Sequence, residues 1–230
     1  MFDLPLVGSV MPTLATGIWL TLRLSALIIL VGTALALPLA LCRNARLGGL
    51  RVLAGAYIMF FRGTPSLVQL FLLYYGAAQF DVLRLSPLWP VLRDPFWCVV
   101  IALGLNSASY TGKTLATALR AVPACMREAA CMLGLSSART FWLIELPLAV
   151  RAALPAFGNE LILTCKATSL ASTVTLLELT GTARLLTAQT YAPYEVFLSA
   201  GLMYLALNTS LMFAMRRLEK RFDHHRATPA

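Results

Sequence analysis

Five long apolar segments dominate this chain and leave few folds open to it. Apolar residues make up 59% of its 230 residues and charged residues only 13%, whereas a soluble domain carries about 25% charged residues. Ten-residue segments with alternating polarity, which would indicate a membrane barrel, are not seen. We therefore predict an all-α membrane protein with about five transmembrane helices, because a helix satisfies its own backbone hydrogen bonds in lipid. The segments span about 14–41, 53–75, 96–119, 152–174 and 195–215.

Basic residues are distributed unevenly over the connections between these segments. Connections rich in Lys and Arg stay in the cytoplasm, which predicts an N-terminus outside, a C-terminus in the cytoplasm and an odd number of spans. The net charge of +9 then reflects topology and contact with anionic lipid headgroups rather than nucleic-acid binding. One side carries Arg43, Arg46, Arg51, Lys113, Arg120, Arg127, Arg139, Arg151, Arg216, Arg217, Lys220, Arg221 and Arg226, and the other only Arg84, Arg93 and Arg184.

The connection between the third and fourth segments, about 121–151, carries a series of helix signals. Pro123 suits the start of a helix in which Glu128 lies near the N-terminal end, where a carboxylate favours the helix dipole. Gly134 can adopt the positive φ that ends a helix, and Ser136 or Ser137 can cap the next one. We predict a compact helical projection. The alternative is an amphipathic hairpin that lies on the membrane without a partner.

The same connection contains the spacing Glu-Ala-Ala-x3-Gly-x9-Ile-x-Leu-Pro. This spacing resembles the motif of the membrane subunits of ABC importers, in which the stretch is a short cytoplasmic helix that docks onto a separate ATPase. The resemblance implies an ATPase-coupling loop whose residues shape a contact and perform no chemistry. They are Glu128, Ala129, Ala130, Gly134, Ile144, Leu146 and Pro147, the last of which falls at the entrance to the fourth segment.

Other parts of the chain are similar to the permeases of polar-amino-acid importers, among them residues 60–65, 105–111 and 168–170. Residues 158–175 are similar to the branch that serves histidine, lysine, arginine, ornithine and opines. The resemblance implies one permease domain over residues 1–230, with a core of about 14–217 and the type I (MetI-like) ABC importer fold. It also implies a multi-pass protein of the bacterial inner membrane. Its partners would be two copies of an ABC ATPase, a second related permease or a second copy of this chain, and a periplasmic solute-binding protein.

The function implied by this resemblance is the import of basic amino acids or opines. Two alternatives remain open, a permease for a neutral polar amino acid such as glutamine or cystine and a secondary transporter that needs no ATPase. We expect no enzymatic activity, cofactor or metal, since neither a catalytic constellation nor a metal-binding pattern is present. Gly112-Lys113-Thr114 resembles the end of a phosphate-binding loop, but the earlier glycine of that motif is replaced by Ser107.

Glu160 is the most informative ionisable residue within a segment. It lies about 12 Å into the fourth segment at ~1.5 Å per residue, close to the middle of a core about 30 Å thick. A carboxylate there can bind a cationic solute. Equally, it can pair with Arg62 or Arg23 of another helix, whereas Lys166 on its own helix points about 120° away. Both interpretations remain open.

Residues 62–65, Arg-Gly-Thr-Pro, interrupt the second segment, because proline lacks a backbone donor. Broken helices occur where the backbone lines a cavity or is buried in protein. Thr64, Gln69 and Asn106 are therefore further candidates for the solute pathway. The alternative is that the interruption is a packing kink and that the polar side chains hold neighbouring helices together.

Overall fold

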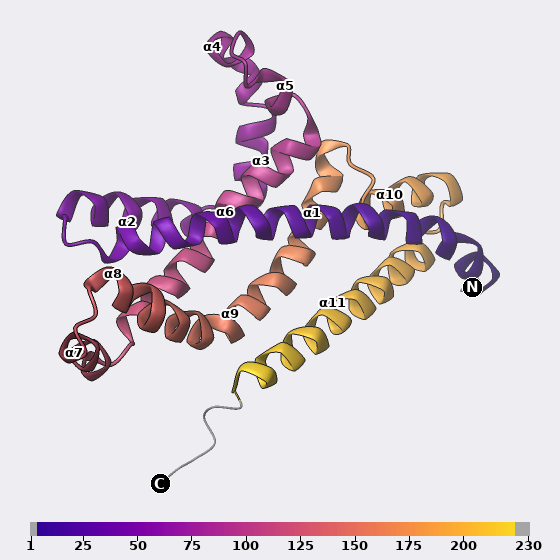
Figure 1. The fold of residues 1–230 in the computed structure, drawn as a ribbon. Coiled ribbons are helices and arrows are strands. Elements are labelled where there is room, and N and C mark those ends of the chain that lie inside the picture. Colours follow the sequence, from indigo (N-terminus) through magenta and orange to yellow (C-terminus); the bar gives the residue numbers. More distant parts are fainter. Residues whose placement is uncertain (1–3, 224–230) are drawn as a thin grey trace.

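The computed structural model describes residues 4–223, and this part of the chain contains helices and no strands (Figure 1). Arg226, counted above among the basic residues, lies outside it. The α-helices are α1 (Leu4–Asn44), α2 (Gly48–Gly63), α3 (Ser66–Tyr74), α4 (Asp81–Arg84), α5 (Trp89–Leu92), α6 (Pro95–Arg120), α7 (Ala124–Met132), α8 (Ser137–Thr140), α9 (Leu146–Ala167), α10 (Leu179–Thr190) and α11 (Pro193–Asp223). Three short elements join them, namely η1 (Ala77–Gln79), the π-helical η2 (Phe141–Glu145) and the 3-10 helix η3 (Thr168–Val174).

Helix α1 runs through the whole molecule and touches each part of its interior. It packs along α6 and also contacts α2, α9, α10 and α11. Of the three clusters of buried apolar side chains, one includes Leu24 and Ile28, the second Val10 and Leu14, and the third Ala40. At 41 residues and ~1.5 Å each, α1 is about 60 Å long and exceeds the predicted segment of 14–41 at its N-terminal end.

Small residues bring α1 and α6 close together. A Cβ added at Gly104 would lie 2.8 Å from Cγ1 of Val31, and one at Gly32 would lie 2.9 Å from Oγ of Ser107. Such glycines allow two helix backbones to approach, which increases van der Waals contact where lipid supplies no hydrophobic driving force. More than half of the residues of α6 are buried, and they include the polar residues Ser107, Ser109 and Thr111.

Within the described residues 4–223, three helical stretches are long and apolar enough to cross a membrane: Pro5–Asn44, Ser137–Val174 and Pro193–Arg221. The second predicted segment is not one straight helix, because α2 and α3 are bent by 101° at Thr64 and Pro65. That pair would be a fourth span. Helix α6 covers the third predicted segment but is less apolar than these spans, since it carries a run of polar residues from Asn106 onward. The total of five spans therefore stays a prediction.

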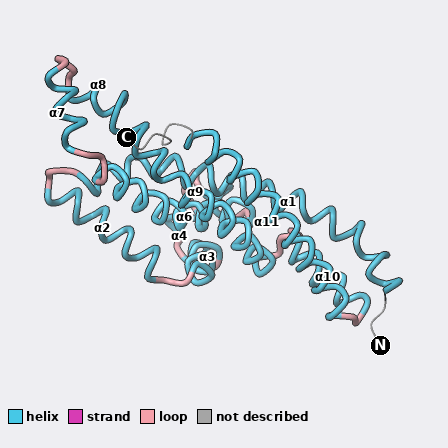
Figure 2. Tube along the Cα trace, turned by 90° about the horizontal axis from the view of Figure 1, so that it is seen from below, coloured by secondary structure: helices cyan, strands magenta, loops and turns pink. Residues whose placement is uncertain are grey.

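The molecule has two distinct ends (Figure 2). The turn between α1 and α2 lies at one end together with α7 and α8, whereas α10 and the N-terminal part of α1 lie at the other. The turn is tied to α6, because Asn44 Nδ2 donates to the carbonyl of Ala116 at 2.9 Å and Arg120 Nε donates to Asn44 Oδ1 at 2.6 Å. The end that holds α7 and α8 thus collects the basic connections identified in the sequence.

Candidate functional site: a coupling projection and an acidic cavity

Helix α7 is the first part of the projection predicted at residues 121–151. It begins at Ala124, directly after Pro123, and Gly134 follows it with φ of 73°. Two backbone bonds close its C-terminus, Gly134 N to Cys131 O at 2.9 Å and Leu135 N to Ala130 O at 3.0 Å. This pair of bonds is the Schellman motif, which needs a left-handed residue at the glycine position. The predicted helix start after Pro123 and the predicted positive φ of Gly134 are both confirmed.

Two details of the sequence prediction are refined by the structure. Ser136, rather than Ser137, caps α8, because its hydroxyl accepts from the Arg139 amide at 3.4 Å. Glu128 is in the middle of the nine-residue α7 instead of near its N-terminal end. The prediction that it favours the helix dipole there is wrong, since that effect is confined to the first turn.

The second half of the projection is continuous with the next long helix. Helix α8 passes through the π-helical η2 into α9, and Pro147 lies directly after η2, in the first turn of α9. An ion pair of 2.9 Å between Arg127 Nε and Glu145 Oε1 connects α7 to η2. This pair was not anticipated from the sequence, because the two residues are far apart along the chain and only the turn at Gly134 brings them together.

The residues of the predicted coupling loop divide between surface and interior. Glu128, Ala129, Gly134 and Pro147 are exposed, Ile144 and Leu146 are half-buried, and Ala130 is buried. Next to the exposed set, Met132 and Leu133 are 90% and 79% exposed, and Trp142 and Leu143 are also exposed. Large apolar side chains gathered on a projection are typical of a contact surface for another protein. Sequence reasoning missed them because a single exposed apolar residue is common.

The interruption between α2 and α3 is held by a network of polar side chains. Thr64 and Pro65 are extended, which leaves the carbonyls at the end of α2 without helical partners. Gln69 Nε2 donates to the Phe61 carbonyl at 3.0 Å and to Thr64 Oγ1 at 2.6 Å. Asn106 Nδ2 donates to the same Phe61 carbonyl at 2.9 Å and to Gln69 Oε1 at 2.9 Å. Three of the predicted pathway residues thus stabilise the break itself.

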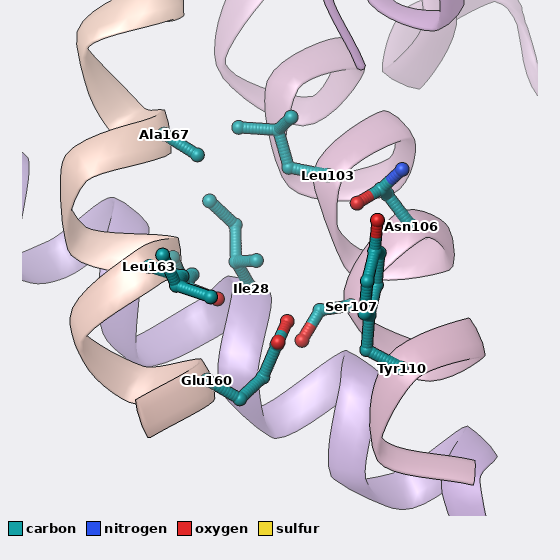
Figure 3. A pocket seen from close by; sticks show the side chains of 9 residues that line it. Ile28, Leu103, Asn106, Ser107, Tyr110, Glu160, Leu163 and Ala167 are labelled. Atoms are coloured by element: carbon teal, nitrogen blue, oxygen red, sulfur yellow. The ribbon is translucent and has the colours of Figure 1, made fainter. Parts of the chain in front are cut away.

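Glu160 lines a cavity of about 170 Å³ between α1, α6 and α9 (Figure 3). Its carboxylate points toward the hydroxyl of Ser107, and Tyr110 and Asn106 lie beside it on α6. The Ser107 and Thr164 hydroxyls interact with this carboxylate, and the positive charge of Arg62 acts on it from a longer distance. Among the described residues Glu160 forms no ion pair. The cavity therefore presents an acceptor group without a directly bound cation.

The structure brings all four predicted pathway residues into one region. Asn106 belongs both to the network with Thr64 and Gln69 and to the cavity of Glu160. Sequence reasoning left Tyr110 without a role here, although it lies one helical turn beyond Asn106 and so on the same face of α6. The guanidinium of Arg62 is stacked on its ring, with the Arg62 Cζ 4.7 Å from the ring centroid.

Comparison with known proteins now places this architecture in a class. Residues 28–224 match the family described as "Binding-protein-dependent transport system inner membrane component". The chain belongs to this family. A solved amino acid ABC transporter with histidines superposes with a TM-score of 0.84 at 28% identity, covering 96% of this chain and 99% of that one. The inward-facing methionine ABC transporter MetNI gives a TM-score of 0.76 at 18% identity over 96% and 99% of the two chains. The predicted MetI-like permease fold is confirmed.

Three relatives with names that give a transported solute share more than 40% of their aligned residues with this chain. The chain is 45% identical to the octopine transport system permease protein OccM of Rhizobium radiobacter, over 90% of this chain and 84% of the relative. It is 42% identical to the nopaline transport system permease protein NocM of Agrobacterium fabrum, over 88% and 85% of the two chains. It is 43% identical to the arginine ABC transporter permease protein ArtM of Escherichia coli K12, over 74% and 76%.

Proposed function

We propose that this chain is the permease subunit of an ATP-driven importer that moves basic amino acids or opines across the bacterial inner membrane. The observation that carries the proposal is the exposed projection of α7, whose Glu128 and Gly134 lie on the surface of a chain of the transport family. Relatives that are named as octopine, nopaline and arginine permeases support the solute class. A permease for a neutral polar amino acid such as glutamine or cystine is the second candidate.

The proposed topology has five spans in a single permease domain. Helix α6 is the span that brings the total to five and is third in chain order. Its 26 residues reach about 39 Å at ~1.5 Å per residue, which is more than a core of about 30 Å. The end that carries α7 and α8 is cytoplasmic because it is rich in Arg and Lys. The N-terminus is then outside and the C-terminus inside. Two ATPase copies bind at the cytoplasmic end, a solute-binding protein docks outside, and a second permease chain completes the path.

The coupling mechanism follows from how α7 is connected. ATP binding and hydrolysis in the partner subunits move α7, and this chain supplies no ATPase site of its own. The Arg127–Glu145 ion pair passes the displacement to η2, and the continuous helix from Ser137 carries it into α9. Glu160 lies 14 residues along α9 from Leu146, so it is about 21 Å from the entrance of the helix. A movement of the projection therefore reorients the cavity in the middle of the bundle.

The proposed solute contact is the carboxylate of Glu160. It can accept hydrogen bonds from a guanidinium or ammonium group, which are charge-assisted and strong in a site shielded from water. Thr64 and Gln69 contribute by holding the interruption of the second helix beside the cavity, and Asn106 adds its amide to the cavity wall.

Uptake assays with two variants test this proposal. Gly134→Asp adds a carboxylate to an exposed position of the projection, at a φ of 73°, and is expected to abolish solute uptake and solute-stimulated ATPase activity in vesicles that carry the assembled transporter. Gly48→Asp is the matched control, because Gly48 is at the same end, has open space around it and has no positive φ. Glu160→Gln is expected to reduce arginine uptake. Normal transport by Gly134→Asp would overturn the coupling role of the projection.

A further inference from the structure

A second cavity, rich in positive charge, adjoins the cavity of Glu160. It has a volume of about 490 Å³ and is lined by Arg43 of α1, Arg62 of α2, and Tyr110 and Lys113 of α6. No Asp or Glu lines it. Among the described residues, Arg43, Arg62 and Lys113 form no ion pair. Arg62 and Lys113 are exposed and Arg43 is half-buried, so these cations from three helices give an open hollow a positive potential that attracts anions.

Tyr110 is the wall that both cavities share. The first hollow includes Glu160 and Asn106, and the second includes Arg62, whose guanidinium lies over the Tyr110 ring at 4.7 Å from Cζ to the centroid. Arg62 acts electrostatically on Glu160, yet the two groups form no ion pair. Tyr110 therefore borders both a hollow that holds a carboxylate and a hollow that holds three cations.

The cations extend from Tyr110 toward the cytoplasmic end of the proposed topology. Lys113 lies almost one helical turn beyond Tyr110 on α6, and Arg43 is in the last turn of α1. The Arg43 guanidinium carbon lies 4.0 Å from the point that a Cβ at Gly55 would occupy, so this side chain reaches across to α2. A solute that leaves the Glu160 cavity toward the cytoplasm would pass along these positive groups.

We infer that Arg62 and Lys113, with Arg43 beyond them, form a carboxylate-binding subsite opposite Glu160, and that this pair of subsites selects guanidino solutes with more than one carboxylate. The inference rests on the proposed function of the chain as an importer of basic amino acids or opines. A guanidinium binds Glu160, and the carboxylates at the far end of the same molecule bind the cations. Bidentate pairing between a guanidinium and a carboxylate makes Arg62 the stronger of the two near partners.

The proposed preference for octopine over arginine follows from the net charges of the two solutes. Arginine carries a net positive charge, which the positive cavity disfavours. Octopine has the same guanidinium and one more carboxylate, so it has no net charge and can occupy both subsites at once. The difference between the two solutes is therefore expected in their relative transport, whereas their shared dependence on Glu160 should be the same.

Competitive uptake into proteoliposomes that contain the complete transporter tests this inference. Labelled arginine and octopine are supplied together with one unchanged solute-binding protein, so a change in their uptake ratio reports on the permease. Lys113→Gln is expected to lower the octopine-to-arginine ratio about ten-fold, a difference of about 1.4 kcal/mol. Lys113→Arg keeps the charge and should keep the ratio. Lys166→Gln is the control, because Lys166 lines a different groove, between α9 and α11.

An unchanged ratio in Lys113→Gln overturns the subsite, and so does a loss of the second permease chain from the purified complex, since the cations would then pair with that subunit. An equal loss of both solutes in Lys113→Gln and Lys113→Arg also overturns it, because Lys113 would be structural. Wild-type uptake of arginine without octopine refutes the inference and leaves the importer intact. Uptake of neither solute, or of glutamine alone, refutes the proposed function itself.

Discussion

The turn at Gly134 provides a graded test of how the projection works. Gly134 has φ of 73°, and a Cβ added there meets no atom within 4 Å. A substitution is therefore penalised by backbone conformation alone, without a clash inside this chain. A residue other than glycine is destabilised by roughly 1–2 kcal/mol in the left-handed region, and asparagine is destabilised less than alanine or valine. The penalty falls on the Schellman bonds of Gly134 and Leu135, so it shifts the end of α7 and leaves the rest of the bundle in place.

The affinity of the ATPase for the permease is expected to fall in the order wild type, Gly134→Asn, Gly134→Ala and Gly134→Val. If the strained turn must be restored whenever the ATPase binds, a cost of about 1–2 kcal/mol weakens that binding roughly 5- to 30-fold. The assay is titration of purified ATPase onto the assembled permease in nanodiscs, with solute-stimulated hydrolysis measured in the same samples. Thermal unfolding of the permease alone should change little. An Asn variant that binds as weakly as the Val variant would refute the conformational argument, because a clash with the partner would then dominate.

Three further predictions concern other parts of the chain. Asn106→Leu leaves the side-chain oxygen of Gln69 without its donor and should lower the free energy of unfolding by about 1–3 kcal/mol, measured by thermal denaturation in detergent; Asn106→Asp, whose carboxylate would face the two acceptor oxygens that Asn106 now binds, should lower it by at least as much. The half-exposed Arg127–Glu145 pair should give a coupling energy below about 1 kcal/mol in a double-mutant cycle on stability, and a much larger effect on the ratio of solute transported to ATP hydrolysed would support its role in coupling. Burial raises the pKa of Glu178, which lies between the spans, although hydrogen bonds from the Thr180 amide, the Tyr204 hydroxyl and the Gly181 amide oppose the shift. Because the folded pKa exceeds the unfolded one, the folded state binds more protons, and stability should fall as pH rises from the ordinary Glu range through the raised pKa; Glu178→Gln should remove this slope, and an unchanged slope would contradict the assignment.

Local signals in the sequence predicted the projection well. Pro123, Gly134 and Pro147 each restrict the backbone where they stand, so their effects can be inferred without knowledge of the fold. The break at Pro65 was predicted for the same reason. Its extent was not, since a bend of 101° depends on how α3 packs against α6.

The sequence alone does not predict which side chains contact one another across helices. Gln69 and Asn106 were identified as polar residues in apolar segments, which indicates either a pathway or helix packing. Their shared contact with the Phe61 carbonyl depends on the three-dimensional crossing of α2 and α6. Likewise, the charge of Glu160 was visible in the sequence, but its place in a cavity beside the Tyr110 that stacks with Arg62 was not.

The central position of α1 has a consequence for how the chain is assembled. Translation produces α1 first, yet Val10 and Leu14 are covered by residues of α10 and α11, which are made last. The core around Leu24 and Ile28 is completed by Ala171 and Val174 of η3, so it must wait until α9 and η3 have been made. The face of α1 near Val10 must wait longer still, for the final two helices. A chain cut short before Leu179 would therefore hold an incomplete bundle in which one apolar surface of α1 is still uncovered.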